Sequence, residues 1–360
     1  MEKNHRYAVI MAGGIGSRFW PVSKTSRPKQ FLDILGTGKS FIRHTFERFS
    51  KVIPAENFLV VTNTRYRPMV LEHLPELREE QVLCEPLSRN TAPCVAYAAR
   101  HIHAIDPAAT MVVTPSDHLI LNENEFSEVI TEGLGFAESH DALVTIGIQP
   151  GRPDTGYGYI QIDTGKKDGS FCKVKTFTEK PTLDVAKMFV ESGEFFWNAG
   201  IFIWRTEKIL REFEKYLPEV AQIFASIAGA YNTPDEQAAI DHIYPECRNV
   251  SIDYGIMEKS ADTYVRCSDF GWSDIGTWGS LYTHRPKDVD DNAITGEAIA
   301  YDTRGCLISI PEGKVGVVKG LEEYIVVASE DSLLICPRSE EQCIRQFVED
   351  VKLKKGDEYV

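Results

Sequence analysis

A short apolar run leads into a glycine-rich loop in the stretch Tyr7-Ala-Val-Ile-Met-Ala-Gly-Gly-Ile-Gly-Ser-Arg-Phe-Trp-Pro-Val-Ser-Lys-Thr-Ser-Arg-Pro-Lys-Gln-Phe31. Tyr7 to Met11 has the length and composition of a buried strand in a parallel sheet. The loop after it contains the glycines Gly13, Gly14 and Gly16. Glycine lets a backbone turn sharply and approach a ligand closely. The stretch therefore predicts a central strand followed by a ligand-binding loop.

Positive charge gathers just after this loop, on Arg18, Lys24, Arg27 and Lys29. The whole chain, in contrast, carries a formal net charge of −14. Because the local charge opposes the global charge, the segment suits a polyphosphate, which backbone N–H groups of the loop can also contact.

Two commoner phosphate motifs fit the sequence poorly. A dinucleotide fingerprint counted from Gly14 would need a glycine at position 19, which is Phe19, so a nicotinamide or flavin site is not indicated. Gly36-Thr-Gly-Lys-Ser40 is similar to the end of a P-loop, but its first glycine would fall at Asp33. We interpret this second segment as a polar turn before a helix.

The motifs Gly-Gly-Ile-Gly-Ser-Arg18 and Arg27-Pro-Lys-Gln-Phe31 together resemble the signature of the sugar-phosphate nucleotidyltransferases. The forms Phe19-Trp-Pro21 and Lys29-Gln-Phe31 are most similar to the mannose-1-phosphate guanylyltransferase branch. The resemblance implies that Arg18 and Lys29 hold the phosphates of a nucleoside triphosphate and act in catalysis. It assigns nucleotide binding to the loop residues Ala12, Gly13, Gly14 and Gly16. A glycine turn with solvated charges is the alternative.

Bulk properties limit the possible partners. A chain of 360 residues with 43% hydrophobic content is long enough for a large domain and a smaller one. The acidic balance argues against a nucleic-acid partner or an anionic membrane surface. The N-terminal residues 1–6 are polar, and no run of about 18 apolar residues occurs, so we expect no membrane span, no signal peptide and a cytoplasmic location. The eight scattered cysteines indicate neither a zinc site nor a disulfide framework.

Up to about residue 150, short apolar runs alternate with amphipathic stretches. The runs are Tyr7–Met11, Phe58–Thr62, Gln81–Cys84, Thr110–Thr114 and Ala142–Gly147. This alternation predicts an α/β fold with helices on both faces of a parallel sheet. With the resemblance, the expected fold is a Rossmann-like, mixed and mainly parallel sheet of the nucleotide-diphospho-sugar transferase type. Ligands of such sheets bind at the carboxyl ends of the strands.

Polar residues follow the third and fourth of these runs. Glu85 has two carboxylate oxygens that could accept from the N1–H and N2–H₂ donors of guanine, so it is our hypothesis for the base reader. Asn90 could contact ribose or phosphate, or cap a helix over residues 92–105. Ser116 and Asp117 follow the fourth run, and resemblance of the Ser-Asp-His step implies nucleotide binding by Ser116 and a metal ligand at Asp117. From spacing alone, Asp117 would be read as a turn or cap residue.

Motifs between residues 151 and 285 point to the sugar phosphate. Gly158 lies in a glycine-containing strand opening that suits close approach to a sugar. The Glu-Lys-Pro step implies that Glu179 accepts from sugar hydroxyls and that Lys180 neutralises the 1-phosphate; without the resemblance, both would be surface charges. Asn198 is a single amide in an apolar strand, so it needs a partner: in relatives a sugar hydroxyl, otherwise an internal backbone group.

Asp274 completes the expected metal site. Gly271-Trp-Ser-Asp-Ile-Gly-Thr-Trp278 resembles the family block that carries the second metal-binding aspartate. Asp117 and Asp274 would give two hard oxygen ligands to a Mg²⁺ ion that the triphosphate also holds. The two tryptophans of the block are expected to be packing residues. Asp253 and Lys259 remain possible sugar-side contacts.

The sequence changes character near its end. Closely spaced short β runs between residues 292 and 336, followed by a predicted helix over 340–351 and a polar tail over 352–360, indicate a small β domain. The resemblance implies a left-handed β-helix-like unit that serves in homodimer formation. We thus expect a catalytic domain over 1–285, with a nucleotide half over 1–150 and a sugar-phosphate half over 151–285, and a C-terminal domain over 286–360.

Together with the resemblance, which implies the substrates and the metal, these observations predict a Mg²⁺-dependent transfer of a guanylyl group from GTP to mannose 1-phosphate without a covalent intermediate. No motif offers a nucleophile beside a base, whereas cations and carboxylates suit positioning and charge stabilisation. Two alternatives remain. The chain could use another nucleotide or sugar 1-phosphate, or it could be a catalytically silent regulatory subunit that binds nucleotide sugar.

Overall fold

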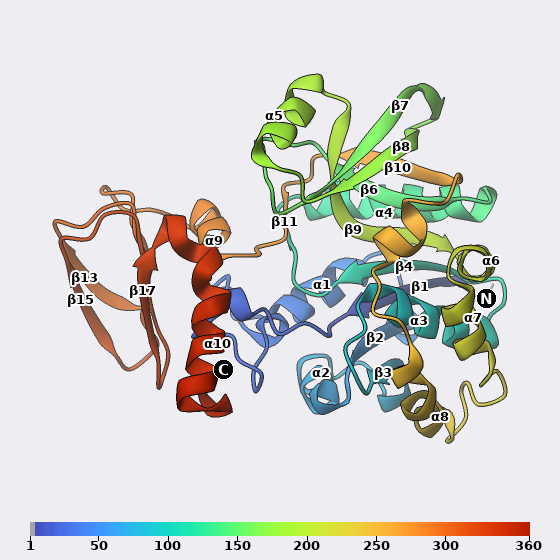
Figure 1. Ribbon diagram of the computed structural model, residues 1–360, viewed down its shortest axis with the longest axis horizontal. Coiled ribbons are helices and arrows are strands. Elements are labelled where there is room, and N and C mark those ends of the chain that lie inside the picture. Colours follow the sequence, from blue (N-terminus) through green and yellow to red (C-terminus); the bar gives the residue numbers. More distant parts are fainter. Residues whose placement is uncertain (1–3) are drawn as a thin grey trace. The chain divides into compact units, whose positions relative to one another are not determined.

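The computed structural model describes residues 4–360; the first three residues of the polar N-terminal stretch lie outside it. The fold divides into two compact units (Figure 1). The described part of the first unit contains residues 4–13, Arg43–Ser116 and Ile120–Trp272, and the second unit contains Gly14–Ile42, Asp117–Leu119 and Ser273–Val360. The division expected at residue 285 is not the division between these units, because the glycine-rich loop packs with the C-terminal segment.

A nine-stranded sheet forms the centre of the first unit. Its order is β3 (Val82–Glu85), β2 (Phe58–Asn63), β1 (Arg6–Met11), β4 (Thr110–Pro115), β9 (Phe195–Arg205), β6 (Leu143–Ile148), β10 (Thr263–Ser268), β8 (Phe171–Glu179) and β7 (Gly158–Asp168). Neighbours among β1 to β4 pair in parallel, as do β6 and β10. Strands β8 and β9 run against the rest. The mixed, mainly parallel sheet predicted from the sequence is thus confirmed.

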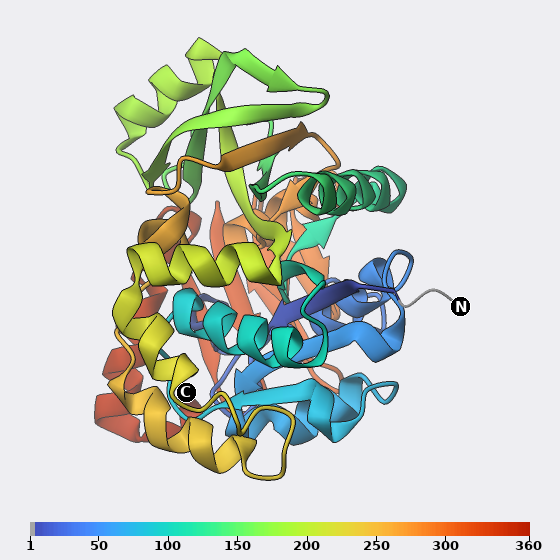
Figure 2. The ribbon, with the colours of Figure 1, turned by 90° about the vertical axis from the view of Figure 1, so that its right-hand side faces the viewer.

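Helices cover both faces of this sheet. On β9, Phe202 and Trp204 join a hydrophobic cluster with residues of α3 (Thr91–Ile105), α6 (Thr206–Tyr216) and α7 (Pro218–Ala225). The residue between them, Ile203, lies against Gly133 of α4 (Glu123–Ser139), where a Cβ would come within 2.5 Å of its Cδ1. Alternate residues of a strand point to opposite faces, so α4 lies on the face opposite α3 and α6, which run side by side (Figure 2).

Four further helices accompany these. They are α1 (Phe41–Phe49), α2 (Arg67–His73), α5 (Leu183–Ser192) and α8 (Glu236–Ile243). Just before α1, the backbone N–H groups of Thr37 and Gly38 donate to the Asp33 carboxylate over 2.9 and 2.7 Å. The segment at 36–40 is therefore the polar turn that we predicted. None of the helices in residues 4–360 is long and apolar enough to cross a membrane.

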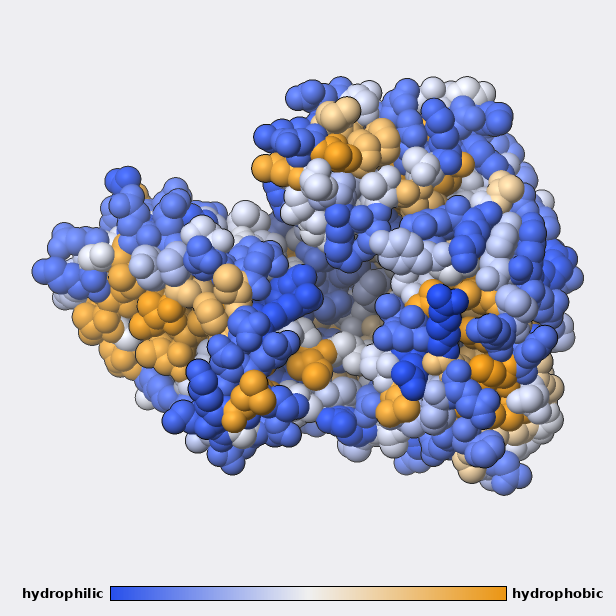
Figure 3. Space-filling view, in the orientation of Figure 1, coloured by the Kyte–Doolittle hydropathy of each residue, from blue (hydrophilic) through white to orange (hydrophobic). Residues whose placement is uncertain are grey.

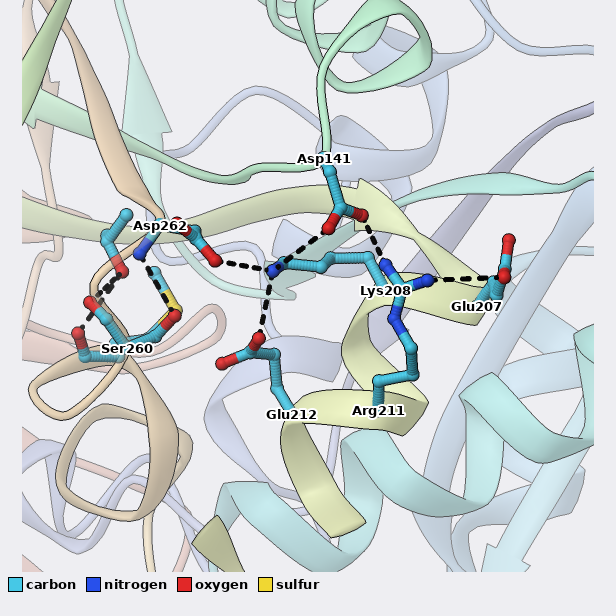
Figure 4. Close-up of polar contacts among 9 residues, drawn as sticks. Asp141, Glu207, Lys208, Arg211, Glu212, Ser260 and Asp262 are labelled. Carbon is cyan, nitrogen blue, oxygen red and sulfur yellow. Dashed lines mark hydrogen bonds and ion pairs between the residues drawn. The ribbon is translucent and has the colours of Figure 1, made fainter. Parts of the chain in front are cut away.

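A buried ion network fixes α6 (Figure 4). The Lys208 side chain is only 4% exposed, and its Nζ lies 2.8 Å from Asp262, 2.9 Å from Glu212 and 3.4 Å from Asp141. Burial would lower the pKa of Lys208, but the hydrogen bonds to Asp262 and Glu212 outweigh it and raise that pKa. Asp141 lies two residues before β6 and Asp262 directly precedes β10, so the ammonium ties the helix to the starts of two parallel strands.

The second unit contains a small β domain. One sheet is built from β12 (Ala293–Thr295), β14 (Leu307–Ser309), β16 (Tyr324–Ala328) and β17 (Leu333–Pro337), and a two-stranded sheet from β13 (Glu297–Tyr301) and β15 (Val315–Lys319). Strands of successive coils pair in parallel, and only β17 returns antiparallel. Gly296 has φ 83° and its Cβ would lie 2.0 Å from the Ile310 carbonyl oxygen, so the turn between β12 and β13 requires glycine. This arrangement agrees with the β-helix-like unit that the resemblance implies.

The core of the second unit joins the beginning of the chain to its end. Phe19, Trp20 and Phe41 cluster with residues of α9 (Trp278–His284), the β domain and α10 (Ile344–Lys355). The predicted polar tail is wrong for its last residues, because the Tyr359 carbonyl accepts a hydrogen bond from Trp20 Nε1 over 2.8 Å and Val360 packs on this core. The hydrogen bond from Trp20 Nε1 therefore holds the last residues on this core, although their composition is polar.

Candidate functional site

The backbone at the end of β1 is held by its neighbours. Ala12 N–H donates to the Val61 carbonyl over 2.8 Å, and its carbonyl accepts from Thr62 over 2.7 Å. Ala12 therefore has its backbone N–H and carbonyl committed to the sheet. Ser116, at the end of β4, is held likewise: its N–H donates to the Met11 carbonyl, and its own carbonyl accepts from Thr45. Nucleotide contacts by these residues remain a prediction.

Gly16 gives the loop its shape. Its φ is 75°, which disfavours residues with a Cβ, and a Cβ there would lie 2.5 Å from Lys29 Cβ. Lys29 N–H donates to the Ile15 carbonyl over 3.0 Å, so the loop and the lysine are directly joined. Gly14, in contrast, has nothing within 4 Å of its Cβ position.

Lys29 is the centre of a charged cluster. It is 3% exposed, and its Nζ lies 2.9 Å from Asp117 Oδ2 and 2.9 Å from the Asp274 carbonyl oxygen. The rings of Phe19 and Phe41 lie 5.4 and 5.0 Å from it, which adds a cation–π contribution. Burial would raise the pKa of Asp117, but the charges of Lys29 and His118 outweigh that effect and lower it, so Asp117 is ionised.

These groups line one cavity of about 310 Å³ in the second unit, which we call the Lys29 cavity. Its lining consists of Gly16, Ser17, Arg18, Phe19, Lys29, Asp117, His118, Asp274, Gly276 and Arg345. The structure thus brings together the four charged residues that the sequence assigned to the triphosphate and the metal. Arg345, from α10, was missed, because an isolated arginine in a C-terminal helix carries no motif.

The carboxylates of the Lys29 cavity fit a hard cation in part. Asp117 and Asp274 supply oxygen ligands of the kind that Mg²⁺ prefers. Asp274 Oδ1 also accepts from Gly276 N–H over 3.0 Å, which orients that carboxylate. Within residues 4–360, no group of three or more His, Cys, Asp or Glu side chains could hold a metal by itself. A magnesium ion here would complete its coordination with water and with phosphate oxygens of a bound molecule.

Glu85 occupies a buried position at the end of β3. It is 7% exposed, its Oε1 accepts a hydrogen bond from the Tyr244 hydroxyl, and its Oε2 lies 3.5 Å from the Cβ position of Gly13. Burial raises the pKa of Glu85 to about 7, although the Tyr244 hydrogen bond opposes this. One of the two oxygens assigned to guanine is therefore already engaged. Tyr244 was missed because it lies 159 residues away in a segment without a motif.

Asn90 acts as the helix cap that was one of its two interpretations. Its side-chain oxygen accepts from Thr91 N–H over 2.9 Å at the start of α3. The neighbouring Arg89 donates to the Pro245 carbonyl over 2.9 Å. Both polar side chains thus have partners within the first unit, and a ribose contact by Asn90 stays a prediction.

The predicted sugar-phosphate residues gather at the ends of β7 and β8. Gly158 pairs with Glu179 across the two strands, and a Cβ on this glycine would lie 2.5 Å from Glu179 Oε2. Only glycine therefore leaves room for the carboxylate. Lys180 forms an ion pair with Glu179, while its side chain remains 58% exposed and its φ is 47°. A non-glycine residue with positive φ is a strained position of the kind found at ligand sites.

Asn198 has a definite partner, as its burial predicted, but the partner is a side chain. Asn198 Nδ2 donates to Asp253 Oδ1 over 2.7 Å, and its oxygen accepts from Gly200 N–H over 3.1 Å. The alternative that Asn198 bonds an internal backbone group is therefore right only for the bond from Gly200 N–H. Burial raises the pKa of Asp253 to about 6, with the Asn198 hydrogen bond lowering it and the Glu179 charge raising it. The charge of Glu179 therefore acts on Asp253, the carboxylate that holds Asn198.

Packing explains the two tryptophans near Asp274. Trp278 is 2% exposed in the core of the second unit, and Trp272 packs on Tyr157 and Trp197 in the first unit. Their interpretation as packing residues is confirmed.

Comparisons with known proteins agree with this set of residues. Residues 7–291 match the family model described as nucleotidyl transferase, and residues 296–351 match that of the MannoseP isomerase/GMP-like beta-helix domain. A mannose-1-phosphate guanylyltransferase of Klebsiella pneumoniae is 37% identical over 359 residues, which cover 98% of this chain and 75% of the relative. The enzyme of that name from Escherichia coli K12 is 35% identical over 362 residues, with 98% and 74% covered.

A solved structure extends the similarity to the fold. A Thermus thermophilus protein described as a mannose-1-phosphate geranyltransferase superposes with a TM-score of 0.86 at 29% identity, over 97% of this chain and 100% of that chain. The similarity to this solved structure thus extends over the whole architecture, from the glycine-rich loop to the C-terminal coils. The chain belongs to the nucleotidyl transferase family, with a beta-helix domain of the MannoseP isomerase/GMP-like kind at its C-terminal side.

Proposed function

We propose that this chain is a mannose-1-phosphate guanylyltransferase, which converts GTP and mannose 1-phosphate to GDP-mannose and pyrophosphate in the cytoplasm. The observation that carries the proposal is the Lys29 cavity. There, segments far apart in the sequence bring the predicted phosphate-binding cations and the two carboxylates together. The relatives that span 98% of the chain and bear this name support the choice of substrates.

The reaction needs no covalent enzyme intermediate. A phosphate oxygen of mannose 1-phosphate attacks the α-phosphorus of GTP, the new P–O bond forms, and the bond between the α-phosphorus and the bridging oxygen breaks to release pyrophosphate. Lys29 and Arg18 counter the charge that develops on the leaving pyrophosphate, and Lys180 holds the attacking phosphate. Such transfers depend mainly on positioning and on charge stabilisation.

Recognition of the two substrates falls to residues of the first unit. Glu85, oriented by Tyr244, accepts from guanine through its remaining acceptor capacity. Glu179 and Asn198, the latter held by Asp253, face the mannose hydroxyls. A Mg²⁺ ion held by Asp117 and Asp274 would neutralise part of the phosphate charge when it is bound.

The active form is proposed to be a homodimer that assembles through the β domain. Apolar side chains on its strands are about half exposed or more: Ile299 49%, Tyr301 53%, Val315 73%, Val317 67%, Leu333 57% and Ile335 54%. In the β13–β15 ladder Ile299 and Val317 are direct neighbours, and a hydrophobic area covers β13, β15 and β17 (Figure 3). Contiguous apolar surface of this kind marks an interaction site, and a second copy of the chain presents a matching surface.

The test is a screen for pyrophosphate release. Purified protein is incubated with Mg²⁺ and each pairing of GTP, ATP, UTP or dTTP with mannose or glucose 1-phosphate, and the Lys29→Ala variant serves as the control for contaminating activity. We expect release with GTP and mannose 1-phosphate, and little without Mg²⁺. Turnover of a different pair would correct the substrates. Absence of turnover with every pair would favour the silent regulatory subunit.

A further inference from the structure

Arg345 is a cation that the proposed mechanism does not use. It stands in the first turn of α10 and lines the Lys29 cavity with Arg18 and Lys29. Both arginines belong to the second unit, and the charge of Arg345 adds to burial in lowering the pKa of Arg18. Two guanidinium groups therefore repel one another across one small cavity.

Carboxylates within reach along the helix do not neutralise Arg345. Glu341 and Glu349 lie four positions before and after it, which is the spacing of stabilising helical ion pairs. Glu341 Oε2 instead accepts from Gly279 N–H over 2.7 Å. Within residues 4–360, Arg345 forms no ion pair with either glutamate.

The other two cations of the cavity, Lys29 and Arg18, differ in whether a carboxylate pairs with them. Lys29 is paired with Asp117 at 2.9 Å. The Nε of Arg18 is buried without a hydrogen-bond partner in the described part of the chain, and Asp274 and Glu341 act on Arg18 only through their charges. In a protein of net charge −14, two arginines that line one cavity and have no ion-pair partner among residues 4–360 indicate that an anion completes the site.

We propose that Arg345 binds the β- and γ-phosphates of the nucleotide, and hence the leaving pyrophosphate, together with Arg18. The proposal rests on the proposed function and makes the C-terminal helix part of the active site. A guanidinium can donate two parallel hydrogen bonds to a phosphate, which fixes its orientation as well as its charge. Arg345 therefore stabilises the free and the departing pyrophosphate. GDP-mannose contains neither the β- nor the γ-phosphate of GTP, because its second phosphate comes from mannose 1-phosphate, so its binding gains little from Arg345.

Direct binding provides the test. Calorimetric titration with pyrophosphate in the presence of Mg²⁺ is compared for wild type, Arg345→Ala, Arg345→Lys and Lys354→Ala. Lys354 is an exposed cation of the same helix and is the matched control. We expect Arg345→Ala to weaken pyrophosphate binding roughly ten-fold or more, Arg345→Lys to restore part of it, and Lys354→Ala to bind as wild type. GDP-mannose binding should change less than two-fold in all three variants.

Kinetics separates positioning from a structural effect. In the pyrophosphate-consuming direction, Arg345→Ala should raise KM for pyrophosphate while KM for GDP-mannose stays near wild type, and thermal unfolding of the two proteins should coincide. Equal pyrophosphate affinity in wild type and Arg345→Ala, or no pyrophosphate binding to wild type, overturns the proposal. So does an equal loss of affinity for both ligands, which shows a structural role. Because the titration needs no sugar, failure of the mannose assignment alone leaves this test decisive.

Discussion

At the scale of single residues, Lys29 connects the loop to the carboxylate of Asp117 and to the main-chain carbonyl of Asp274. We expect Lys29→Ala to lower kcat by roughly 10²–10³-fold while GTP binding weakens less, because its charge is needed most when pyrophosphate departs. Steady-state kinetics combined with equilibrium GTP titration measures both effects. An unchanged kcat would remove Lys29 from the mechanism.

The ionisation of Glu85 gives a pH-dependent prediction. The pKa of Glu85 is raised to about 7, so the free protein carries a neutral carboxyl group below pH 7 and a carboxylate, the better acceptor for guanine donors, above it. The ratio of kcat/KM for GTP to that for ATP should therefore increase as the pH rises through 7. In Glu85→Gln the ratio should be low and flat from about pH 6 to about pH 8.5. A wild-type ratio that does not change with pH would place the base reader elsewhere.

The same shift affects stability in the opposite direction. Because the folded-state pKa is raised above its ordinary value of 4.5, the Glu85 contribution is fully present below pH 4.5 and is lost as the pH rises through about 7. The loss amounts to about 3 kcal/mol at most, at about 1.36 kcal/mol per pH unit. If Glu85 reads the base as proposed, it must act at neutral pH as a carboxylate that the fold disfavours.

Residues with a motif could be predicted from the sequence, and residues without one could not. Lys29, Asp117 and Asp274 each stand in a recognisable block, and their convergence was expected from the family resemblance of those blocks. Tyr244 and Arg345 reach their positions only through the packing of segments that have no local signature. The hydrogen bond between Asn198 and Asp253 likewise depends on tertiary structure, although burial of a lone amide predicted that some partner exists.

At the scale of elements, the glycine loop can be tested with two matched substitutions. Gly16→Ala meets both a positive φ and a contact of 2.5 Å with Lys29, so it should displace the lysine and reduce kcat at least ten-fold, with a loss of about 1–3 kcal/mol in stability. Gly14→Ala meets no protein atom within 4 Å, so it should change stability little and reduce kcat less than Gly16→Ala does. Equal kcat values for the two variants would show that loop geometry does not control Lys29.

The ion network of α6 predicts a loss of stability without loss of chemistry. Lys208→Ala leaves Glu212 and Asp262 without their buried cation, so the unfolding free energy in urea should fall by about 3–5 kcal/mol, while kcat at a temperature where the variant is folded should stay near wild type. Arg211→Ala removes a half-exposed cation of the same helix and should cost about 1 kcal/mol or less. Similar losses in both variants would contradict the role of burial.

Strand and helix positions before residue 150 could be predicted because apolar runs and amphipathic stretches alternate regularly there. The direction of β8 and β9 could not, since a buried antiparallel strand has the same apolar composition as a buried parallel one. The helix α10 extends beyond its predicted end at residue 351, because residues 352–355 continue the same helical turns with exposed side chains.

At the scale of the whole molecule, the apolar face of the β domain predicts an oligomer. Val317→Lys introduces a charge within that face, where the native side chain is 67% exposed, and should convert a dimer to a monomer. Val289→Lys changes an exposed valine outside the strands of that face and should leave the dimer intact. Sedimentation velocity distinguishes the two. A monomeric wild type, or a dimeric Val317→Lys protein, would reject this interface.

The division of the chain into units was the part of the architecture least accessible from sequence. Composition changes near residue 290, and the two family models also meet there, at 291 and 296. Contacts nevertheless place Gly14–Ile42 with Ser273–Val360, because the side chains of Phe19 and Trp20 are buried against α9 and α10 rather than against the sheet. No periodic pattern in a loop of this kind reveals which distant segment will cover it.

The core shared by the two ends of the chain has a consequence for biosynthesis. Phe19, Trp20 and Phe41 leave the ribosome among the first residues, but most of the buried residues of their core come after Ser273, far later in the chain. At translation rates of roughly 5–20 residues per second, these aromatic side chains wait on the order of 10–50 s before their own core can form. The glycine-rich loop is therefore among the first segments to be made and among the last to be completed, and a chaperone that binds nascent chains would meet it throughout that interval.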